Sequence, residues 1–139
     1  MEKTLVLLKP DTIRKGICGD ALQRFEKAGY KILGCKMMQL DEALLKEHYS
    51  HLLELPFFPE IQEFMQSTPV IALALAKENA VVDMRDLLGP TDSTKAPKGT
   101  LRGDLGETVM LNVAHASDSE ENAAIELQRF FKSEEIFDY

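Results

Sequence analysis

Thr4 to Leu8 reads TLVLL, and this almost wholly apolar stretch stops at Lys9-Pro10. A short apolar run that ends at a proline is typical of a strand covered on both faces of a sheet. We therefore expect residues 4–8 to form a central strand, with Lys9 at its end. A strand of this kind needs neighbouring strands and two layers of helix around it, and the rest of the chain has to supply them.

The spacing of apolar residues along the rest of the chain predicts these helices and strands, and the two kinds of element alternate. Apolar residues recur at helical spacing in some segments and at alternate positions in others, and glycine or proline separates many of the segments. In chain order, the expected elements are a helix over 17–28, a strand over 31–40, two helices over 42–65 broken at Pro56, a strand over 70–76, a helix over 80–88, a long loop over 90–106, a short strand over 109–113 and a helix after a turn at His115.

Strands that alternate with helices predict an α/β sandwich. The order fits the two-layer ferredoxin-like pattern βαββαβ with extra helices inserted, and it fits a doubly wound sheet equally well. A length of 139 residues without an internal repeat, linker or low-complexity tract predicts a single domain over residues 1–139.

Composition narrows the function classes. The net charge of −7 argues against nucleic acid or a membrane surface as a main partner, because both kinds of binding rest on a basic field. The longest apolar run, over 70–76, is too short to cross a bilayer, and residues 1–10 lack the features of a signal peptide. We therefore expect a cytoplasmic protein in which Cys18 and Cys35 are reduced and buried.

The stretch Asn112–Glu126, NVAHASDSEENAAIE, places a histidine before an expected helix. Ser117 with Glu120, or Asp118 with Glu121, would form a capping box, so we expect the helix to begin just after His115. A helix start favours an anionic group beside the histidine. On these residues alone, a hydrogen-bonded turn histidine with no chemical role is an equally good interpretation.

Three cations are candidates to bind a polyphosphate, although each alone is more often a solvated surface residue. They are Lys9 at a strand end, Arg85 on a helix and Arg102 in the glycine-rich loop. The chain has neither GxxxxGK[ST] nor GxGxxG, so a bound nucleotide would be held by side chains. Phe57-Phe58, between two prolines, forms an aromatic corner that either packs in the core or stacks on a base.

A metal pair at His48 and His51 is geometrically allowed, because the two residues are three apart on an expected helix. Spacing suggests no third ligand for such a pair. We therefore favour a half-exposed helix face for these two histidines and expect no dedicated metal site.

Together these motifs resemble the nucleoside diphosphate kinase family. NVAHASDS at 112–119 is similar to its signature NxxH[GA]SDS, and TLVLLKPD, LPFFPE at 55–60, TPV at 68–70 and GTLRGD at 99–104 follow the family order. The resemblance covers essentially the whole chain. It implies a ferredoxin-like α/β (α+β) two-layer sandwich, with a βαββαβ core, an antiparallel four-stranded sheet and inserted helices.

By this resemblance the chain moves the γ-phosphoryl group of a nucleoside triphosphate, mainly ATP, to a nucleoside diphosphate, and so maintains nucleotide pools. A ping-pong mechanism through a phosphohistidine on His115 is implied, as are Mg²⁺ carried on the nucleotide phosphates and a homo-oligomer, tetramer or hexamer, built from dimers. The implied roles are orientation of His115 by Tyr49, Ser117 and Glu126, charge stabilisation by Lys9 and Arg102, and substrate binding by Lys9, Phe57, Ile61, Arg85, Thr91, Arg102, Val109 and Asn112.

Some residues depart from the family pattern. Ala116 follows the histidine where glycine is commoner, and the long loop is altered at Pro90, Ser93 and Ala96-Pro97. These changes leave the assembly undecided between dimer, tetramer and hexamer. The alternative function is a non-catalytic ferredoxin-like module that binds nucleotide or regulates a partner.

Overall fold

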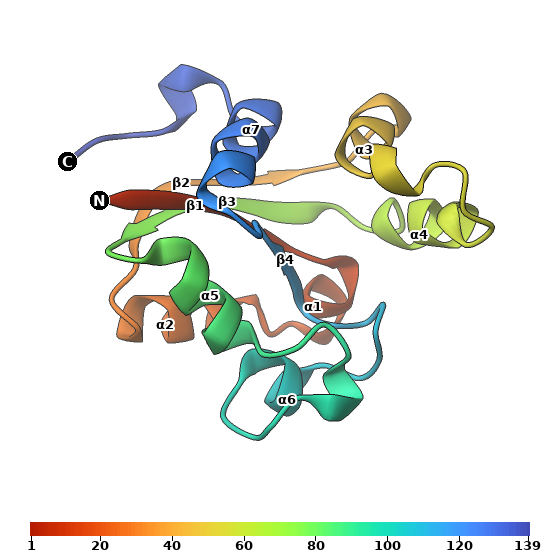
Figure 1. Cartoon of the computed structure of the whole chain (residues 1–139), viewed down its shortest axis with the longest axis horizontal. Helices are drawn as coiled ribbons and strands as arrows, with labels where there is room; N and C mark the ends of the chain where they lie inside the picture. The colour runs from red at the N-terminus through yellow and green to blue at the C-terminus, as the bar shows by residue number, and fades with distance from the viewer.

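A computed structural model describes residues 1–139 as one four-stranded sheet with helices on both faces (Figure 1). Its strands are β1 (Glu2–Leu8), β2 (Lys31–Met38), β3 (Val70–Lys77) and β4 (Ala114–Ala116). Its helices are α1 (Pro10–Lys15), α2 (Cys18–Lys27), α3 (Glu42–His48), α4 (Phe58–Met65), α5 (Ala80–Leu88), α6 (Leu101–Leu105) and α7 (Glu120–Phe130), with single 3₁₀ turns at Ser50–Leu52, Ser93–Lys95 and Ser133–Glu135.

β1 is a central strand of the sheet, as the sequence predicts. The strand order is β2-β3-β1-β4, and every neighbouring pair is antiparallel. Leu5 pairs with Ala74 of β3, and Leu7 pairs with His115 of β4. This is the ferredoxin-like arrangement, so the doubly wound alternative, which needs parallel strands, is wrong.

Both faces of the sheet are covered, which explains why residues 4–8 are apolar without alternation. On one face Leu5 and Leu7 pack with residues of α3, α4 and α7, and on the other Val6 and Leu8 pack with residues of α2 and α5. Figure 1 shows the two helical layers on opposite sides of the sheet. The small side chains of β3 belong to the first face, where Ala72, Ala74 and Ala76 lie in the same cluster as Phe130 and Phe131.

Four local predictions need correction. His115 lies in β4 itself rather than in a turn, and the long loop contains the short helix α6, which Thr100 caps by accepting a hydrogen bond from Gly103 N. The N-cap of α7 is Ser119, because the hydroxyl of Ser117 is engaged elsewhere. The short strand expected over 109–113 lies at Ala114–Ala116 instead.

The two cysteines are less buried than predicted. Cys18 is half-buried at the start of α2, and Cys35 is exposed on β2, which is an edge strand of the sheet. No disulfide joins them. None of the helices combines the length and the apolar character that a membrane span requires.

Candidate active site

A cavity of about 980 Å³ lies where β4, α7, the segment over 48–65 and the segment over 85–112 meet. Nearly all of the site residues predicted from the sequence line it. They are Lys9, Tyr49, Phe57, Ile61, Arg85, Thr91, Arg102, Val109, Asn112, His115 and Glu126. Ser117 is fully buried and lies behind Glu126.

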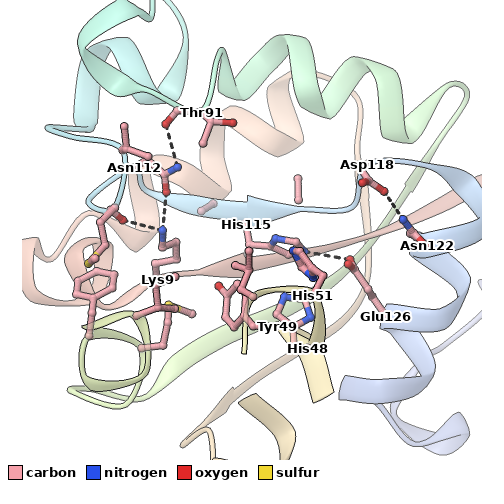
Figure 2. A pocket seen from close by; sticks show the side chains of 18 of the residues that line it. Lys9, His48, Tyr49, His51, Thr91, Asn112, His115, Asp118, Asn122 and Glu126 are labelled. Carbon is pink, nitrogen blue, oxygen red and sulfur yellow. Dashed lines mark hydrogen bonds and ion pairs between the residues drawn. The ribbon is translucent and has the colours of Figure 1, made fainter. Parts of the chain in front are cut away.

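His115 is held by a carboxylate on the wall of this cavity (Figure 2). Its Nε2 lies 3.0 Å from Glu126 Oε1, and the hydroxyl of Ser117 donates to the same oxygen at 2.7 Å. Burial alone would raise the pKa of Glu126, but the hydrogen bonds from His115 and Ser117 and the charge of His115 bring it down to about 2. The carboxylate is therefore ionised, and it fixes Nε2 as the hydrogen-bonded nitrogen of the ring.

Two elements determine this arrangement. Ser119 caps α7 by accepting a hydrogen bond from Asn122 N at 3.0 Å, and Glu126 projects from the second turn of the helix. Ser117 ties the same region to β1, because its Oγ accepts a hydrogen bond from Leu5 N at 3.3 Å. The contact to His115 thus comes from inside α7, from the glutamate that the family resemblance implied.

A tight backbone turn immediately precedes the strand that bears His115. Val113 has φ of +78°, and Ala114 N donates to Asn112 O at 2.9 Å, which defines a γ-turn centred on Val113. A β-branched residue in this conformation carries strain, on the order of 1 to 3 kcal/mol. Buried polar groups offset that strain, because Asp11 accepts from Val113 N at 2.9 Å and Thr12 donates to Val113 O at 2.7 Å.

Lys9 lies at the end of β1 and faces into the cavity (Figure 2). Its ammonium donates to Asn112 Oδ1 and to Met110 O, both at 2.7 Å, and Asn112 Nδ2 donates to Thr91 O at 3.0 Å. Burial lowers the pKa of Lys9 to about 8, and the charge of Arg102 acts in the same direction while Asp11 opposes it. One of its three donors remains free for an anion.

Arg102 is buried and braces the backbone around the histidine. Its guanidinium donates to Asn112 O at 3.0 Å, to Gly89 O at 2.9 Å and to Ala114 O at 2.7 Å. Burial lowers the pKa of Arg102 to about 10, and Arg85 adds to the effect. Three of its five N–H donors are used in these bonds, so two remain for a phosphate.

The two phenylalanines of the aromatic corner take different places, one in the core and one on the cavity wall. Phe58 is buried in the core, whereas Phe57 is 46% exposed and lines the cavity with Ile61 and Val109. Arg85 and Thr91 are also exposed on the cavity wall. The cavity therefore offers the ring of Phe57 for stacking and the exposed guanidinium of Arg85 for an anion.

The other two cavity histidines do not share the half-exposed helix face that the sequence favoured, because His48 is buried at the end of α3 and His51 is exposed in the 3₁₀ turn at Ser50–Leu52. His48 instead groups with His115 and Glu126, and their ligand atoms lie within 4.8 Å of one another. Arg129 donates to His48 Nδ1 at 2.9 Å, so a guanidinium occupies one nitrogen of this group. Tyr49 packs against the His48 ring at 4.8 Å between centroids, and its hydroxyl makes no hydrogen bond to His115 or Glu126.

Several residues that build the site carry no clear signal in the sequence. Asp11 and Thr12 read as a turn after β1, and only the structure brings them to Val113, about 100 positions away. Arg129 reads as an ordinary helix residue. Each contact depends on tertiary pairing, which periodicity and spacing do not report.

The fold and the site together define a class of protein. A ferredoxin-like α/β sandwich holds a histidine–carboxylate pair on the wall of a cavity that also presents a lysine, three arginines and an exposed aromatic ring. Cations that neutralise phosphates beside a positioned nucleophile are what phosphoryl transfer requires. These features define a candidate phosphotransferase that acts on nucleotides.

Comparison with known proteins identifies the family. The model of the family described as nucleoside diphosphate kinase matches residues 2–136, and the chain belongs to this family. A nucleoside diphosphate kinase of Parabacteroides distasonis is 49% identical over 139 residues, with 100% of this chain and 91% of the relative covered. A nucleoside diphosphate kinase of Pyrococcus horikoshii is 44% identical over 141 residues, with 99% and 90% covered.

Solved structures agree. A halophilic nucleoside diphosphate kinase from Halobacterium salinarum, in complex with CDP, matches with a TM-score of 0.96 and 38% identity, over 99% of this chain and 92% of that one. The enzyme of Aquifex aeolicus matches with a TM-score of 0.93 and 39% identity, over 98% and 99%. The chain is therefore an enzyme that transfers a phosphoryl group from a nucleoside triphosphate to a nucleoside diphosphate, and the non-catalytic alternative is set aside.

Proposed function

We propose that the phosphoryl group passes through His115 in a ping-pong reaction. The observation that carries this proposal is the chain of contacts Ser117–Glu126–His115 on the cavity wall. Because Nε2 donates its proton to Glu126, the lone pair of the neutral ring is on Nδ1. In the first half-reaction Nδ1 bonds to the γ-phosphorus as the bond to the diphosphate oxygen breaks, and in the second a different diphosphate oxygen attacks and Nδ1 leaves.

The lining residues have complementary roles in this proposal. Phosphates and sugar are assigned to Lys9, Arg85, Thr91, Arg102 and Asn112, and the base to Phe57, Ile61 and Val109. Lys9 and Arg102 are already anchored by hydrogen bonds, so they meet the transferred group without large rearrangement. Tyr49 lines the same cavity and packs against His48, the neighbour of His115, so we assign it a steric role in orienting the ring. Apolar contacts alone do not read base edges, so low selectivity among bases follows.

Mg²⁺ enters this proposal with the nucleotide. The cavity wall has two carboxylates, and both have partners in the protein, since Glu126 binds His115 and Ser117 while Asp118 binds Asn122. This donor set suits an ion held mainly by phosphate oxygens and water. When bound, the ion would neutralise phosphate charge, and the side chains of the protein would position the phosphates and the imidazole.

Assembly and location complete the proposal. We propose that residues 1–139 form one nucleoside diphosphate kinase domain, and that copies of it associate into dimers and then into a tetramer or hexamer in the cytoplasm. Light scattering of the purified protein tests the assembly, and a monomer at micromolar concentration would contradict it.

The test of the phosphohistidine is direct labelling. Protein incubated with Mg²⁺ and γ-labelled ATP should gain label that is labile in acid and stable in base. His115→Ala should gain none, and the matched variant His51→Gln, which changes another cavity histidine, should label as the parent does. Equal labelling of His115→Ala would refute the proposal.

A further inference from the structure

A second histidine lies against His115 and has no role in the mechanism above. His48 ends α3, is 7% exposed, and contacts the His115 ring edge to face, with centroids 4.5 Å apart and planes at 86°. The rings of Tyr49 and Phe130 enclose it at 4.8 and 5.0 Å. Figure 2 shows His48 and His115 side by side in the pocket.

Arg129 determines which nitrogen of His48 can carry a proton. Its Nη1 lies 2.9 Å from His48 Nδ1. A guanidinium can only donate, so Nδ1 has to accept, and the proton of the neutral ring is on Nε2. Nε2 is buried and has no hydrogen-bond partner. A second proton has no place on the ring while Arg129 occupies Nδ1.

α7 thus holds both imidazoles from one face. Glu126 and Arg129 are three residues apart, which places them one above the other on the helix. Glu126 holds His115, and Arg129 holds His48. The contact of Arg129 with His48 is also closer than its ion pair with the exposed Glu47, whose Oε1 lies 3.8 Å from Arg129 Nε.

A positive charge on His48 would affect the contact between Glu126 and His115. Ligand atoms of His48, His115 and Glu126 lie within 4.8 Å of one another, so a protonated His48 would compete with His115 for the single carboxylate. Burial is the main cause that lowers the pKa of His48 to about 3. The charges around the ring act in both directions, because Glu126 raises this pKa while His115, Arg129 and His51 lower it.

We propose that Arg129 is a positioning residue, which holds His48 neutral with its proton on Nε2 and so reserves Glu126 for His115. The inference rests on the proposed role of His115. It predicts that loss of the guanidinium frees Nδ1 of His48 for protonation, and that a cationic His48 then draws Glu126 away as the pH falls.

The test compares Arg129→Leu with two matched variants. Arg129→Lys keeps a cationic donor, and Glu47→Gln removes the ion-pair partner of Arg129 while leaving the bond to His48 intact. Long-range ¹H–¹⁵N spectra report the tautomer and titration of each histidine, and His51→Gln helps to assign them. The rate of His115 labelling is measured from pH 8 to pH 5.5 for each protein.

In the parent and in Glu47→Gln, His48 should show an unprotonated Nδ1, a protonated Nε2 and no titration above pH 5. In Arg129→Leu it should mix tautomers and titrate. The labelling rate of this variant should stay within about threefold of the parent rate at pH 8. At pH 5.5 it should be about tenfold or more below the parent rate at the same pH, and Arg129→Lys should recover most of the loss.

Two results would overturn the proposal. One is an unchanged His48 spectrum and pH profile in a folded Arg129→Leu. The other is a parent protein in which His48 carries its proton on Nδ1 or titrates above pH 5, and this result holds even if the variants do not fold. Failure of the phosphohistidine proposal has a different signature, namely no label on the parent at any pH.

Discussion

The cations of the site are structural residues before they meet a substrate. Arg102 donates to three carbonyl oxygens, two of them at the start of the His115 strand and one at the end of α5, and Lys9 holds Asn112 and Met110. These bonds fix the direction of the remaining N–H groups, so little reorganisation is needed when phosphate arrives. Substitution of either residue should therefore change the local backbone structure as well as phosphate binding.

Proton uptake on binding tests the environment of Lys9. Its pKa of about 8 means that roughly half of the free protein carries a neutral Lys9 at pH 8. A bound phosphate favours the ammonium and raises the pKa, so binding of a nucleoside diphosphate at pH 8 should take up about half a proton, and much less at pH 7. Calorimetry in buffers of different ionisation enthalpy measures this uptake. It should vanish in Lys9→Arg, and persistence there would assign the proton to another group.

Two serines two positions apart should behave differently. Ser117→Ala leaves the buried Leu5 N without a partner and removes one of the two hydrogen bonds to Glu126 Oε1, which should cost about 1 to 3 kcal/mol of unfolding free energy and slow the labelling of His115. Ser119→Ala removes only the cap of α7, at a cost of about 1 kcal/mol. Its labelling rate should match the parent. Equal labelling by the two variants would contradict the role assigned to Ser117.

Residue roles could be predicted only where sequence motifs carry them. NVAHASDS identified His115, and the cavity contains the predicted Lys9, Phe57 and Arg102. The bond of Arg129 to His48 could not be predicted, because the two residues are 81 positions apart and neither motif nor spacing joins them. The residues alone did not decide whether Phe57 or Phe58 lines the cavity; the family resemblance implied Phe57, and Phe57 lines it while Phe58 is buried.

At the scale of elements, the short pieces were the hardest to predict. β4 has three residues and is a strand only because β1 pairs with it, and α6 has five residues and depends on the Thr100 cap and the buried Arg102. Local hydrophobic pattern is too weak over such lengths. The longer elements have strong periodic signals, and the structure confirms β1, α2, β3 and α5 close to the expected bounds.

Gly103→Ala tests the contribution of α6 to the site. A Cβ at Gly103 would overlap Pro97 O and lie 2.6 Å from Pro97 C, which are backbone atoms that cannot move aside alone. The helix should shift and take Arg102 with it, which should destabilise the fold by about 1 to 3 kcal/mol and weaken binding of a nucleoside diphosphate. Denaturant unfolding and calorimetry measure the two effects.

Gly19→Ala is the matched control for that substitution. It introduces the same methyl group into α2, where a Cβ meets nothing within 4 Å. It should leave nucleotide binding unchanged and stabilise the protein by up to about 1 kcal/mol. A Gly103→Ala protein that binds nucleotide as tightly as Gly19→Ala would show that α6 does not position Arg102.

On the scale of the whole molecule, two-sided burial explains both the fold and its sensitivity to acid. The all-apolar stretch at 4–8 predicted a covered central strand, and the layers on both faces confirm it. The antiparallel order was not fixed by periodicity, because the same alternation of helices and strands also suits a parallel sheet, and only the family resemblance decided between them. The enclosed cluster around His48 is a consequence of this packing.

Stability should fall as the pH drops from about 6.5 to 5. The pKa of His48 is about 3 in the folded protein and about 6.5 in the unfolded chain, so the unfolded chain binds more protons in this interval and stability rises with pH. The loss should approach 2 kcal/mol at pH 5. The lowered pKa of Glu126 acts in the same direction only below about pH 4.5. Urea unfolding at fixed protein concentration measures this, and His48→Phe should flatten the dependence.

Phosphorus NMR of the isolated phosphoenzyme tests the central claim most directly. Protein labelled with ¹⁵N, phosphorylated with ATP and Mg²⁺ and freed of nucleotide, should show a phosphorus nucleus coupled to Nδ1 of a single histidine, His115. Added GDP should remove this signal and yield an equal amount of GTP. Phosphate on Nε2 or on another residue, or GTP formation without a phosphoenzyme, would contradict the account.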